Sequence, residues 1–322
     1  MNLHHRLIRN LTAGCACVLL LLSSCGQGQK PVSERPPSAS VSSSSSSSGP
    51  LPLSMEQAEP SAAPLRTGRQ ELTEMLIDPP YDFNPAEMLP SDFGSFFLEE
   101  FPVARSTKAL LADSPLETSL TVIEAERPGP TVFVVAGIHG DETAGWSAGN
   151  LLAKASIQAG RLLIISPANA LGAKNSTRYV TDRQDLNRSF PGSEDGSCAE
   201  QLADAIFKEI DSARPDLLFD LHEARIVNPK ADYLGSSLIY SDLEGMDTLF
   251  FDLLLATQTG EICSEPFQYY SPGPVGSVNR TVVQELKIPA ITVETFRGYP
   301  LERRIADQLD VVQYALRYYG MI

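Results

Sequence analysis

Six short apolar segments, rich in β-branched residues and bounded by turn residues, predict β-strands. They are Leu120–Ile123, Thr131–Ala136, Arg161–Ser166, Leu217–Leu221, Ser237–Tyr240 and Ala290–Glu294. The run Thr131–Ala136 is flanked by Pro130 and Gly137 and consists mostly of Val and Phe. Such a run is typical of a strand that is buried on both faces of a sheet.

Five further segments, which lie between or after these strands, carry apolar residues at helical spacing. They are Thr143–Ile157, Ala199–Ser212, Glu244–Gln258, Ser277–Leu286 and Leu301–Tyr318. Strands that alternate with helices predict an α/β fold, a three-layer sandwich with a mostly parallel or mixed central sheet. We place this main domain at about Leu110–Ile322.

The beginning of the chain has the order of features found in a bacterial lipoprotein signal. A basic start is followed by the apolar run Ala13–Leu22, which is too short to span a bilayer, and then by Leu22-Ser23-Ser24-Cys25. We therefore expect residues 1–24 to be removed and Cys25 to become the lipid-modified first residue. This predicts a protein in a bacterial cell envelope, outside the cytoplasm and anchored to a membrane.

Two segments separate this signal from the main domain. Residues 25–69 are rich in Ser and Pro and include the serine run Ser42–Ser48, so they bury little apolar surface and predict a flexible tether. Residues 70–109 combine aromatic residues with prolines, and we predict an ordered but irregular N-terminal wrap on the main domain.

Side chains that can bind a metal follow two of the predicted strands. His139 and Glu142 come after Thr131–Ala136, and His222 comes directly after Leu217–Leu221. Ligands of open α/β sheets bind at the carboxyl ends of the strands, and a spacing of three lets His139 and Glu142 point the same way from the first turn of a helix. Two histidines and a carboxylate leave one position of a tetrahedral zinc ion open for water, as in catalytic sites. Two unrelated core histidines are the alternative.

Composition restricts the picture further. The 322 residues are 43% hydrophobic, which suffices for a full core. The net charge of −15 at pH 7 argues against binding to nucleic acid or to an anionic membrane surface through charge. Without the signal peptide and the lipidated cysteine, Cys198 and Cys263 remain; they could pair outside the cytoplasm, and their spacing is not that of metal ligands.

Three motifs occur in order, G-x-H-G-D-E at Gly137–Glu142, D-L-N-R-S-F-P-G at Asp185–Gly192 and D-L-H at Asp220–His222. Together they resemble the zinc carboxypeptidase superfamily, and most of all its succinylglutamate desuccinylase and aspartoacylase branch. The resemblance covers about Pro115–Met321 and implies the zinc carboxypeptidase-like fold. Aspartoacylases carry a sizeable β domain after the catalytic glutamate, whereas this sequence leaves room there for one helix and no large C-terminal β domain.

The resemblance also implies the metal site. One zinc ion per chain would be held by His139, Glu142 and His222. Asp185 would act as the partner that orients His139.

Substrate binding is implied by the residues of the second motif. Asn187 and Arg188, a neutral and a cationic donor side by side, would hold a carboxylate of the substrate. An arginine shortly before this motif polarises the scissile carbonyl in the family. Arg178 is our choice for this role, and Arg183 is its competitor because the spacer is slightly longer here.

The general base implied by the resemblance is Glu294, at the end of a late predicted strand. A nearby carboxylate of this kind takes a proton from water and returns it to the leaving amine. Tyr269 or Tyr270 could place a phenol over the substrate, as a loop tyrosine does in some relatives.

These residues predict a zinc-dependent hydrolase that cleaves an amide bond near a free carboxylate, in the manner of a deacylase. A metallocarboxypeptidase that trims peptides or peptidoglycan-derived peptides is the alternative enzyme. A lipoprotein that only binds a ligand is the alternative from another class, and the complete set of ligands, base and carboxylate-binding residues argues against it.

Overall fold

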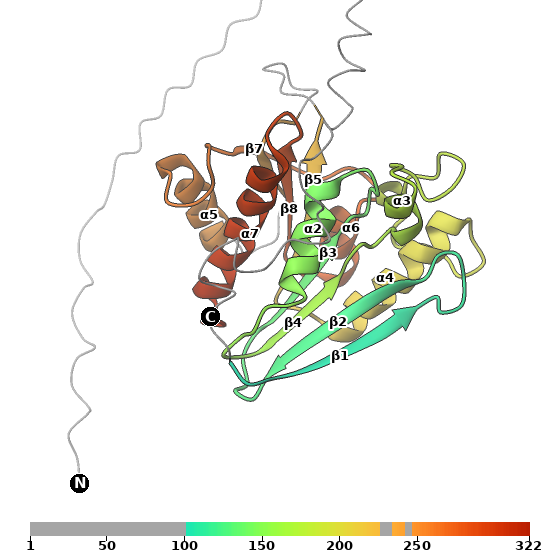
Figure 1. Cartoon of the computed structure of the whole chain (residues 1–322), viewed down its shortest axis with the longest axis horizontal. Helices are drawn as coiled ribbons and strands as arrows, with labels where there is room; N and C mark the ends of the chain where they lie inside the picture. Colours follow the sequence, from blue (N-terminus) through green and yellow to red (C-terminus); the bar gives the residue numbers. More distant parts are fainter. Residues whose placement is uncertain (1–100, 226–233, 242–246) are drawn as a thin grey trace, which may run out of the picture. The chain divides into compact units, whose positions relative to one another are not determined.

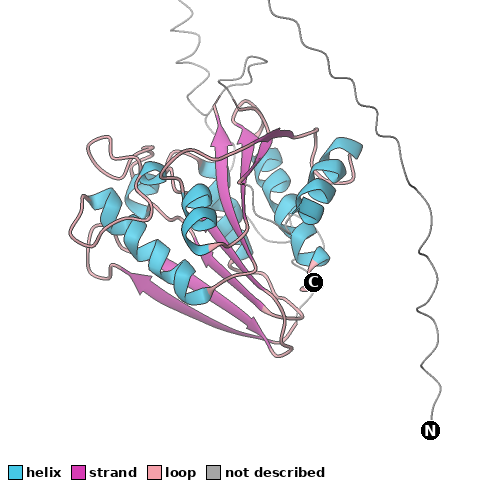
Figure 2. Ribbon diagram, turned by 180° about the vertical axis from the view of Figure 1, so that it is seen from behind, coloured by secondary structure: helices cyan, strands magenta, loops and turns pink. Residues whose placement is uncertain are grey.

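The computed structural model describes residues 101–225, 234–241 and 247–322. The predicted signal peptide, the predicted tether with Cys25 and residues 70–100 of the predicted wrap lie outside the described residues. In the described part, helices cover both faces of one eight-stranded sheet (Figure 1 and Figure 2). The predicted three-layer α/β sandwich with a mixed sheet is confirmed.

The sheet consists of β1 (Val103–Leu110), β2 (Thr118–Ala125), β3 (Thr131–Ala136), β4 (Arg161–Ile165), β5 (Leu217–Ala224), β6 (Ser237–Tyr240), β7 (Gln268–Tyr270) and β8 (Ala290–Phe296). Their order is β1-β2-β4-β3-β5-β8-β6-β7. The neighbours from β4 through β3 and β5 to β8 are parallel, and so are β6 and β7. The pairs β1–β2, β2–β4 and β6–β8 are antiparallel.

Each face of the sheet has its own apolar core. Helices α2 (Thr143–Leu152), α5 (Asp247–Thr259) and α7 (Leu301–Tyr318) cover one face, and α4 (Cys198–Ala213), α6 (Val278–Thr281) and the π-helix η5 (Val282–Leu286) cover the other. Side chains of β3 alternate between the two cores: Val132 and Val134 face the first, Phe133 and Val135 the second. This explains why the strand reads as a continuous apolar run.

Helices α4 and α6 each begin after a serine whose side chain accepts a hydrogen bond from an N–H group of the first turn. Helix α4 starts with a capping box, in which the Ser197 side chain accepts from the Glu200 N–H and the Glu200 carboxylate accepts from the Ser197 N–H. Two shorter helical segments, α3 (Ala170–Lys174) and η4 (Leu186–Arg188), lie in the long connection between β4 and α4.

The order of the strands creates a crevice at the carboxyl ends of β3 and β5. From β3 the chain passes through α2, on one face, to β4. It later passes through α4, on the other face, to β5, which lies on the opposite side of β3. The connection that follows β3 and the connection that leads to β5 thus lie on opposite faces of the sheet. Between two such strands a crevice remains at the carboxyl ends, and ligands of open α/β sheets bind in this crevice.

Two edge strands and one helix end differ from the sequence predictions. Residues 103–109, predicted as irregular chain, form β1 together with Leu110, so the main domain begins earlier than Leu110. Strand β1 is exposed at most positions, and therefore it shows none of the apolar alternation that reveals a half-buried strand. Strand β7 has three residues and was not predicted. Helix α2 ends at Leu152, five residues before the predicted end.

The two remaining cysteines lie on opposite faces of the sheet. Cys198 packs against the core under α4, and Cys263 packs against the core under α5 and α7. Both are free. The pairing that the sequence left open is therefore not formed.

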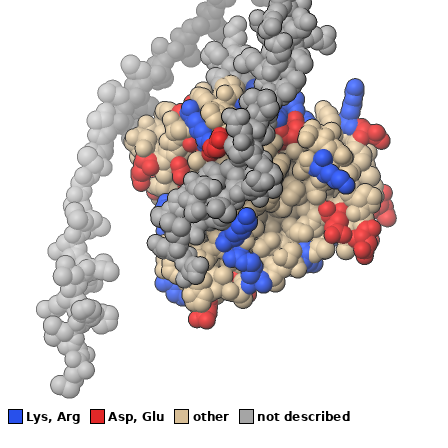
Figure 3. Space-filling model, in the orientation of Figure 1, with Lys and Arg blue, Asp and Glu red and all other residues tan. Residues whose placement is uncertain are grey.

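The surface of the described residues carries charges of both signs. On the face drawn in Figure 3, acidic and basic side chains are interspersed among uncharged ones. Among the helices of the described residues, none has both the length and the hydrophobicity that crossing a membrane requires.

Candidate active site

The turn that joins β3 to α2 carries His139 and Glu142. Gly137 has a φ of +75°, and a Cβ added at Gly140 would lie 2.0 Å from the backbone of Gly172, so the two glycines of the G-x-H-G motif are required by the turn. Both ligand candidates lie just before the helix, with Glu142 at the N-cap, and not on its first turn as predicted. They still point the same way, because His139 Nδ1 lies 2.7 Å from Glu142 Oε1.

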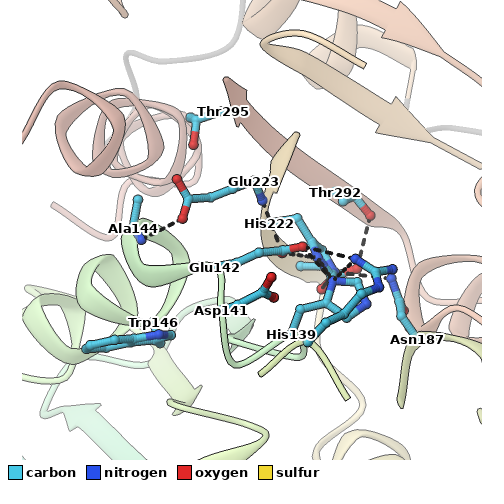
Figure 4. Close-up of polar contacts among 12 residues, drawn as sticks. His139, Asp141, Glu142, Ala144, Trp146, Asn187, His222, Glu223, Thr292 and Thr295 are labelled. Atoms are coloured by element: carbon cyan, nitrogen blue, oxygen red, sulfur yellow. Dashed lines mark hydrogen bonds and ion pairs between the residues drawn. The ribbon is translucent and has the colours of Figure 1, made fainter. Parts of the chain in front are cut away.

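His222 joins this pair from the carboxyl end of β5. Its Nδ1 lies 2.7 Å from Glu142 Oε2 and 3.1 Å from His139 Nδ1, and all three side chains are buried (Figure 4). Two imidazole nitrogens that face each other at this distance cannot both carry a proton between them. Two nitrogen lone pairs and a carboxylate that converge in this way are the donor set that zinc prefers. The structure thus brings together the three predicted metal ligands with donor atoms within 4.8 Å of one another.

Each histidine has a carboxylate at its other ring nitrogen. His139 Nε2 lies 3.1 Å from Asp185 Oδ1, and His222 Nε2 lies 2.8 Å from Asp220 Oδ1. A carboxylate at Nε2 holds the proton there and directs the Nδ1 lone pair toward a metal. Burial opposes ionisation of Asp185, yet its contacts with His139 and Arg178 keep its pKa well below the usual value.

Arg178, and not Arg183, reaches the site. The Arg178 guanidinium lies 3.1 Å from His139 Nδ1 and 3.3 Å from Glu142 Oε1, and it donates to Asp185 Oδ2 at 3.0 Å. Burial lowers the pKa of Arg178, but Glu142 and Asp185 outweigh this and raise it. Arg183 is exposed, in a turn with a φ of +65°.

Asn187 and Arg188 lie on η4, beside the histidines. The Asn187 amide nitrogen is 3.2 Å from His222 Nε2, and the Asn187 Oδ1 accepts from the Val278 N–H at 3.1 Å. Arg188 is exposed and donates to the Asn187 carbonyl at 2.7 Å. Both side chains line a cavity of about 440 Å³ together with His139, Glu142, Arg178 and Glu294. A cavity of this size accommodates a small molecule or the end of a peptide.

Glu294 lies near the carboxyl end of β8, directly opposite His222 in the strand register. Burial raises the pKa of Glu294 to about 8 against the opposing effect of His222, and the negative charges of Glu142 and Asp220 add to the rise. A carboxyl group whose pKa lies near neutrality can both take up and release a proton.

The two predicted loop tyrosines lie elsewhere. The Tyr269 ring packs against Phe250, with ring centroids 5.2 Å apart, and the Tyr270 hydroxyl donates to Gln268 Oε1 at 2.8 Å. Neither residue belongs to the described lining of the cavity. The expectation of a phenol over the substrate from this pair is not supported by their positions.

Several polar residues around the site were missed by the sequence analysis. Asp220 is fully buried, and its Oδ2 accepts from the Thr292 hydroxyl at 3.2 Å. The D-L-H motif contained a signal for it, because a spacing of two puts Asp220 and His222 on the same face of a strand. Asp141 contacts the guanidinium groups of Arg225 and Arg297, and the motif gave no indication of these partners.

A family match covers the part of the chain that carries these residues. Residues 128–319 match the family model described as succinylglutamate desuccinylase/aspartoacylase catalytic domain. A deacetylase for N-alpha-acetyl-L-2,4-diaminobutyric acid from Halomonas elongata is 38% identical over 101 residues, a match that spans 29% of this chain and 28% of the deacetylase.

Solved structures show the same fold. An aspartoacylase family protein from Mesorhizobium loti has a TM-score of 0.53 at 23% identity, over 70% of this chain and 69% of that one. The tripeptide-bound cell shape determinant Csd4 from Helicobacter pylori has a TM-score of 0.53 at 17% identity, over 69% of this chain and 56% of that one. From the family match over most of the described residues, we conclude that the chain belongs to the succinylglutamate desuccinylase/aspartoacylase family.

Proposed function

We propose that the protein is a zinc-dependent hydrolase that cleaves an amide bond near a free carboxylate of its substrate. The observation that carries this proposal is the convergence of His139 Nδ1, Glu142 and His222 Nδ1 at a cavity that Glu294 also lines. The cavity has a donor set that suits zinc, and a carboxyl group whose pKa of about 8 suits proton transfer.

Zinc held by these three residues would polarise the scissile carbonyl and lower the pKa of a water molecule. Glu294 takes the proton of the attacking water and returns it to the nitrogen of the leaving amine. Arg178 donates hydrogen bonds to the oxygen on which negative charge develops. Asp185 and Asp220 hold the two histidines in the tautomers that expose Nδ1.

Asn187 and Arg188 are proposed to bind the substrate carboxylate. Arg188 lines the cavity, is exposed and has guanidinium N–H groups beyond the one that bonds the Asn187 carbonyl. A guanidinium can bind a carboxylate through two parallel hydrogen bonds. A carboxylate held there places a nearby amide bond of the same substrate toward the histidines.

Within this class we favour a deacylase that acts on N-acyl amino acids. Support comes from the family match over residues 128–319 and from the similarity to the Halomonas elongata deacetylase, which acts on N-alpha-acetyl-L-2,4-diaminobutyric acid. The alternative, a carboxypeptidase that releases C-terminal residues from peptides, needs the same zinc ligands and the same carboxylate-binding residues.

The test is a hydrolysis screen of the zinc-loaded full chain against N-succinyl and N-acetyl amino acids, with peptides that end in L- or D-residues alongside. Glu294→Gln serves as the blank, because it keeps the shape of the side chain and loses the base; we expect its kcat to fall by about 10²–10⁴-fold. Release of the acyl group from N-acyl amino acids supports the deacylase. Release of C-terminal residues supports the carboxypeptidase, and inactivity toward both classes with zinc bound contradicts the proposal.

We further propose that Cys25 carries a lipid that anchors the protein in a bacterial cell envelope. The basic start, the short apolar run and Leu22-Ser23-Ser24-Cys25 support this proposal. Metabolic labelling with an alkyne-bearing fatty acid should mark the wild-type chain and leave Cys25→Ser unlabelled. Equal labelling of the two chains contradicts the anchor.

A further inference from the structure

We propose that Glu223 is a positioning residue that caps helix α2 in place of Glu142 and so leaves the Glu142 carboxylate available to zinc. The identity of the metal rests on the proposed function. The capping contacts are properties of the protein chain alone.

Glu142 occupies the N-cap position of α2 without capping the helix. An N-cap side chain ordinarily accepts a hydrogen bond from the second or third N–H group of its helix. The Glu142 side chain makes no such bond, and its two oxygens instead lie 2.7 Å from Nδ1 of His139 and 2.7 Å from Nδ1 of His222. The first turn of α2 contains no acidic residue that could substitute for it. The N–H groups at this helix start therefore need an acceptor from another element.

Glu223 supplies that acceptor from strand β5. The Ala144 N–H, the second of the helix, donates to Glu223 Oε2 at 2.9 Å (Figure 4). Glu223 follows His222 in the strand, so the two side chains leave on opposite faces, one toward α2 and one into the metal site. The Glu223 N–H also donates to Glu142 Oε2 at 3.1 Å. One residue thus holds both the helix start and the carboxylate that the helix start would otherwise attract.

Helix α7 supplies the positive charge that a buried carboxylate requires. Arg304 donates to Glu223 Oε1, and the two side chains are 1% and 0% exposed. One helical turn later, Gln308 donates to the His222 carbonyl at 2.9 Å. Helix α7 therefore holds β5 at two residues. One is Glu223, which positions Glu142, and the other is His222, whose Nδ1 faces the Glu142 carboxylate.

The competing explanation is that the buried ion pair of Glu223 and Arg304 only stabilises the fold. The capping role makes a separate prediction, because it needs an acceptor at position 223 but no charge. In Glu223→Gln with Arg304→Gln, an amide oxygen still accepts from Ala144 and the amide nitrogen can donate to the second glutamine. In Glu223→Leu with Arg304→Met, the acceptor is lost. Neither double variant leaves a buried charge without its partner, which is the costly case for stability.

The test compares the wild-type full chain with the two double variants by two measurements. The first is the crystal structure of each metal-free chain, and the second is its affinity for Zn²⁺, measured in competition with a chromophoric chelator. In Glu223→Leu with Arg304→Met, we expect the Glu142 carboxylate to rotate to hydrogen-bond distance of the Ala144 N–H, away from the histidines. We expect Zn²⁺ affinity to fall by about 10–100-fold, as for other groups that hold a metal ligand in place. The double glutamine variant should keep both the wild-type position of Glu142 and an affinity within about threefold of wild type.

Ser197→Ala is the matched control, since Ser197 caps helix α4 through its own side chain. It should lower the melting temperature and leave Zn²⁺ affinity unchanged. The inference is overturned if Glu142 stays between the histidines in Glu223→Leu with Arg304→Met, or if the double glutamine variant loses affinity equally. If the wild-type chain binds no Zn²⁺, the proposed function fails, and the position of Glu142 in the crystal structures still decides the capping role.

Discussion

The centre and the edge of the sheet differ in what their strands can hold. Strand β5, in the centre, is buried at all eight positions and still carries Asp220, His222 and Glu223. Strand β1, at one edge, pairs only with β2 and is exposed at six of its eight positions. Ionisable groups in a buried strand must be matched by partners, because an unpaired buried charge is costly. The centre therefore fixes its polar side chains in one arrangement, which is what a metal site requires.

Burial also strengthens the interactions between the groups of the centre. Burial by itself would lower the pKa of His222, yet the negative charges of Asp220 and Glu142 raise it well above its usual value. Burial would raise the pKa of Glu142, yet the two histidines lower it well below its usual value. These opposing effects are large because little water screens the charges. The exposed side chains of β1 are screened by solvent.

The largest expected effect is that of His222→Ala, which removes a donor atom from the end of β5. Loss of a group that only orients a ligand costs about 10–100-fold in metal affinity, and loss of a ligand itself should cost more. Because hydrolysis requires the bound zinc, its rate should fall by at least about 10³-fold. Zinc content per chain, measured by mass spectrometry, should fall in parallel.

Asp220→Asn is the control on the same strand. It keeps the size of the side chain and loses the charge beside His222 Nε2, so Zn²⁺ affinity should fall by only about 10–100-fold. An unchanged zinc content in His222→Ala would contradict a metal site at this end of β5.

The next effect concerns stability at the centre. Phe133 on β3 is 0% exposed and packs in the core under α4. Phe133→Ala should lower the free energy of unfolding by about 3–5 kcal/mol, through lost apolar burial and a residual cavity. Urea denaturation measures the change. A loss below about 1 kcal/mol would contradict the close packing of this core.

The loop beside the site offers the same comparison between a residue in contact with the site and an exposed one, in Arg178 and Arg183. Arg178 lines the cavity and contacts Glu142, whereas Arg183 is exposed. Arg178→Met should lower kcat/KM by about 10²–10³-fold, the usual cost of removing a donor to a developing oxyanion. Arg183→Met should leave it within about twofold. Steady-state kinetics on the same substrate decide between the two arginines, and a larger loss in Arg183→Met would reverse the assignment.

Sequence analysis predicted those parts of the molecule whose structure can be inferred from a single short segment of the sequence. The mainly apolar segments Thr131–Ala136 and Leu217–Leu221 indicate two strands, and His139 and His222 lie at or shortly after the ends of these segments. Because β3 and β5 are parallel neighbours, their carboxyl ends meet at one edge, and the two histidines come together without any further information. The predicted cluster of His139, Glu142 and His222 follows from this arrangement.

Contacts between distant segments were not predictable in the same way. Glu223 and Arg304 are far apart in the sequence, and a glutamate or an arginine is ordinarily solvated. Only the packing of α7 against α2 and β8 makes their pair buried. The predicted start of α2 at Thr143 is correct, but the predicted place of Glu142 on its first turn is not. Glu142 precedes the helix, and its carboxylate contacts the two histidines and not the N–H groups of the helix.

Edge strand β1 gives the smallest expected effect and the most direct test of the comparison, because the same substitution can be made at the centre. Thr107 on β1 is exposed, whereas Thr292 on β8 is buried and donates to Asp220 at 3.2 Å. Thr292→Ala leaves a buried acceptor without this donor and should lower the free energy of unfolding by about 1–3 kcal/mol. Thr107→Ala should change it by no more than about 0.5 kcal/mol, since an exposed side chain loses no buried contact. If urea denaturation gives the two variants equal losses, the edge contributes to stability as the centre does, and burial alone does not explain why the site lies where it does.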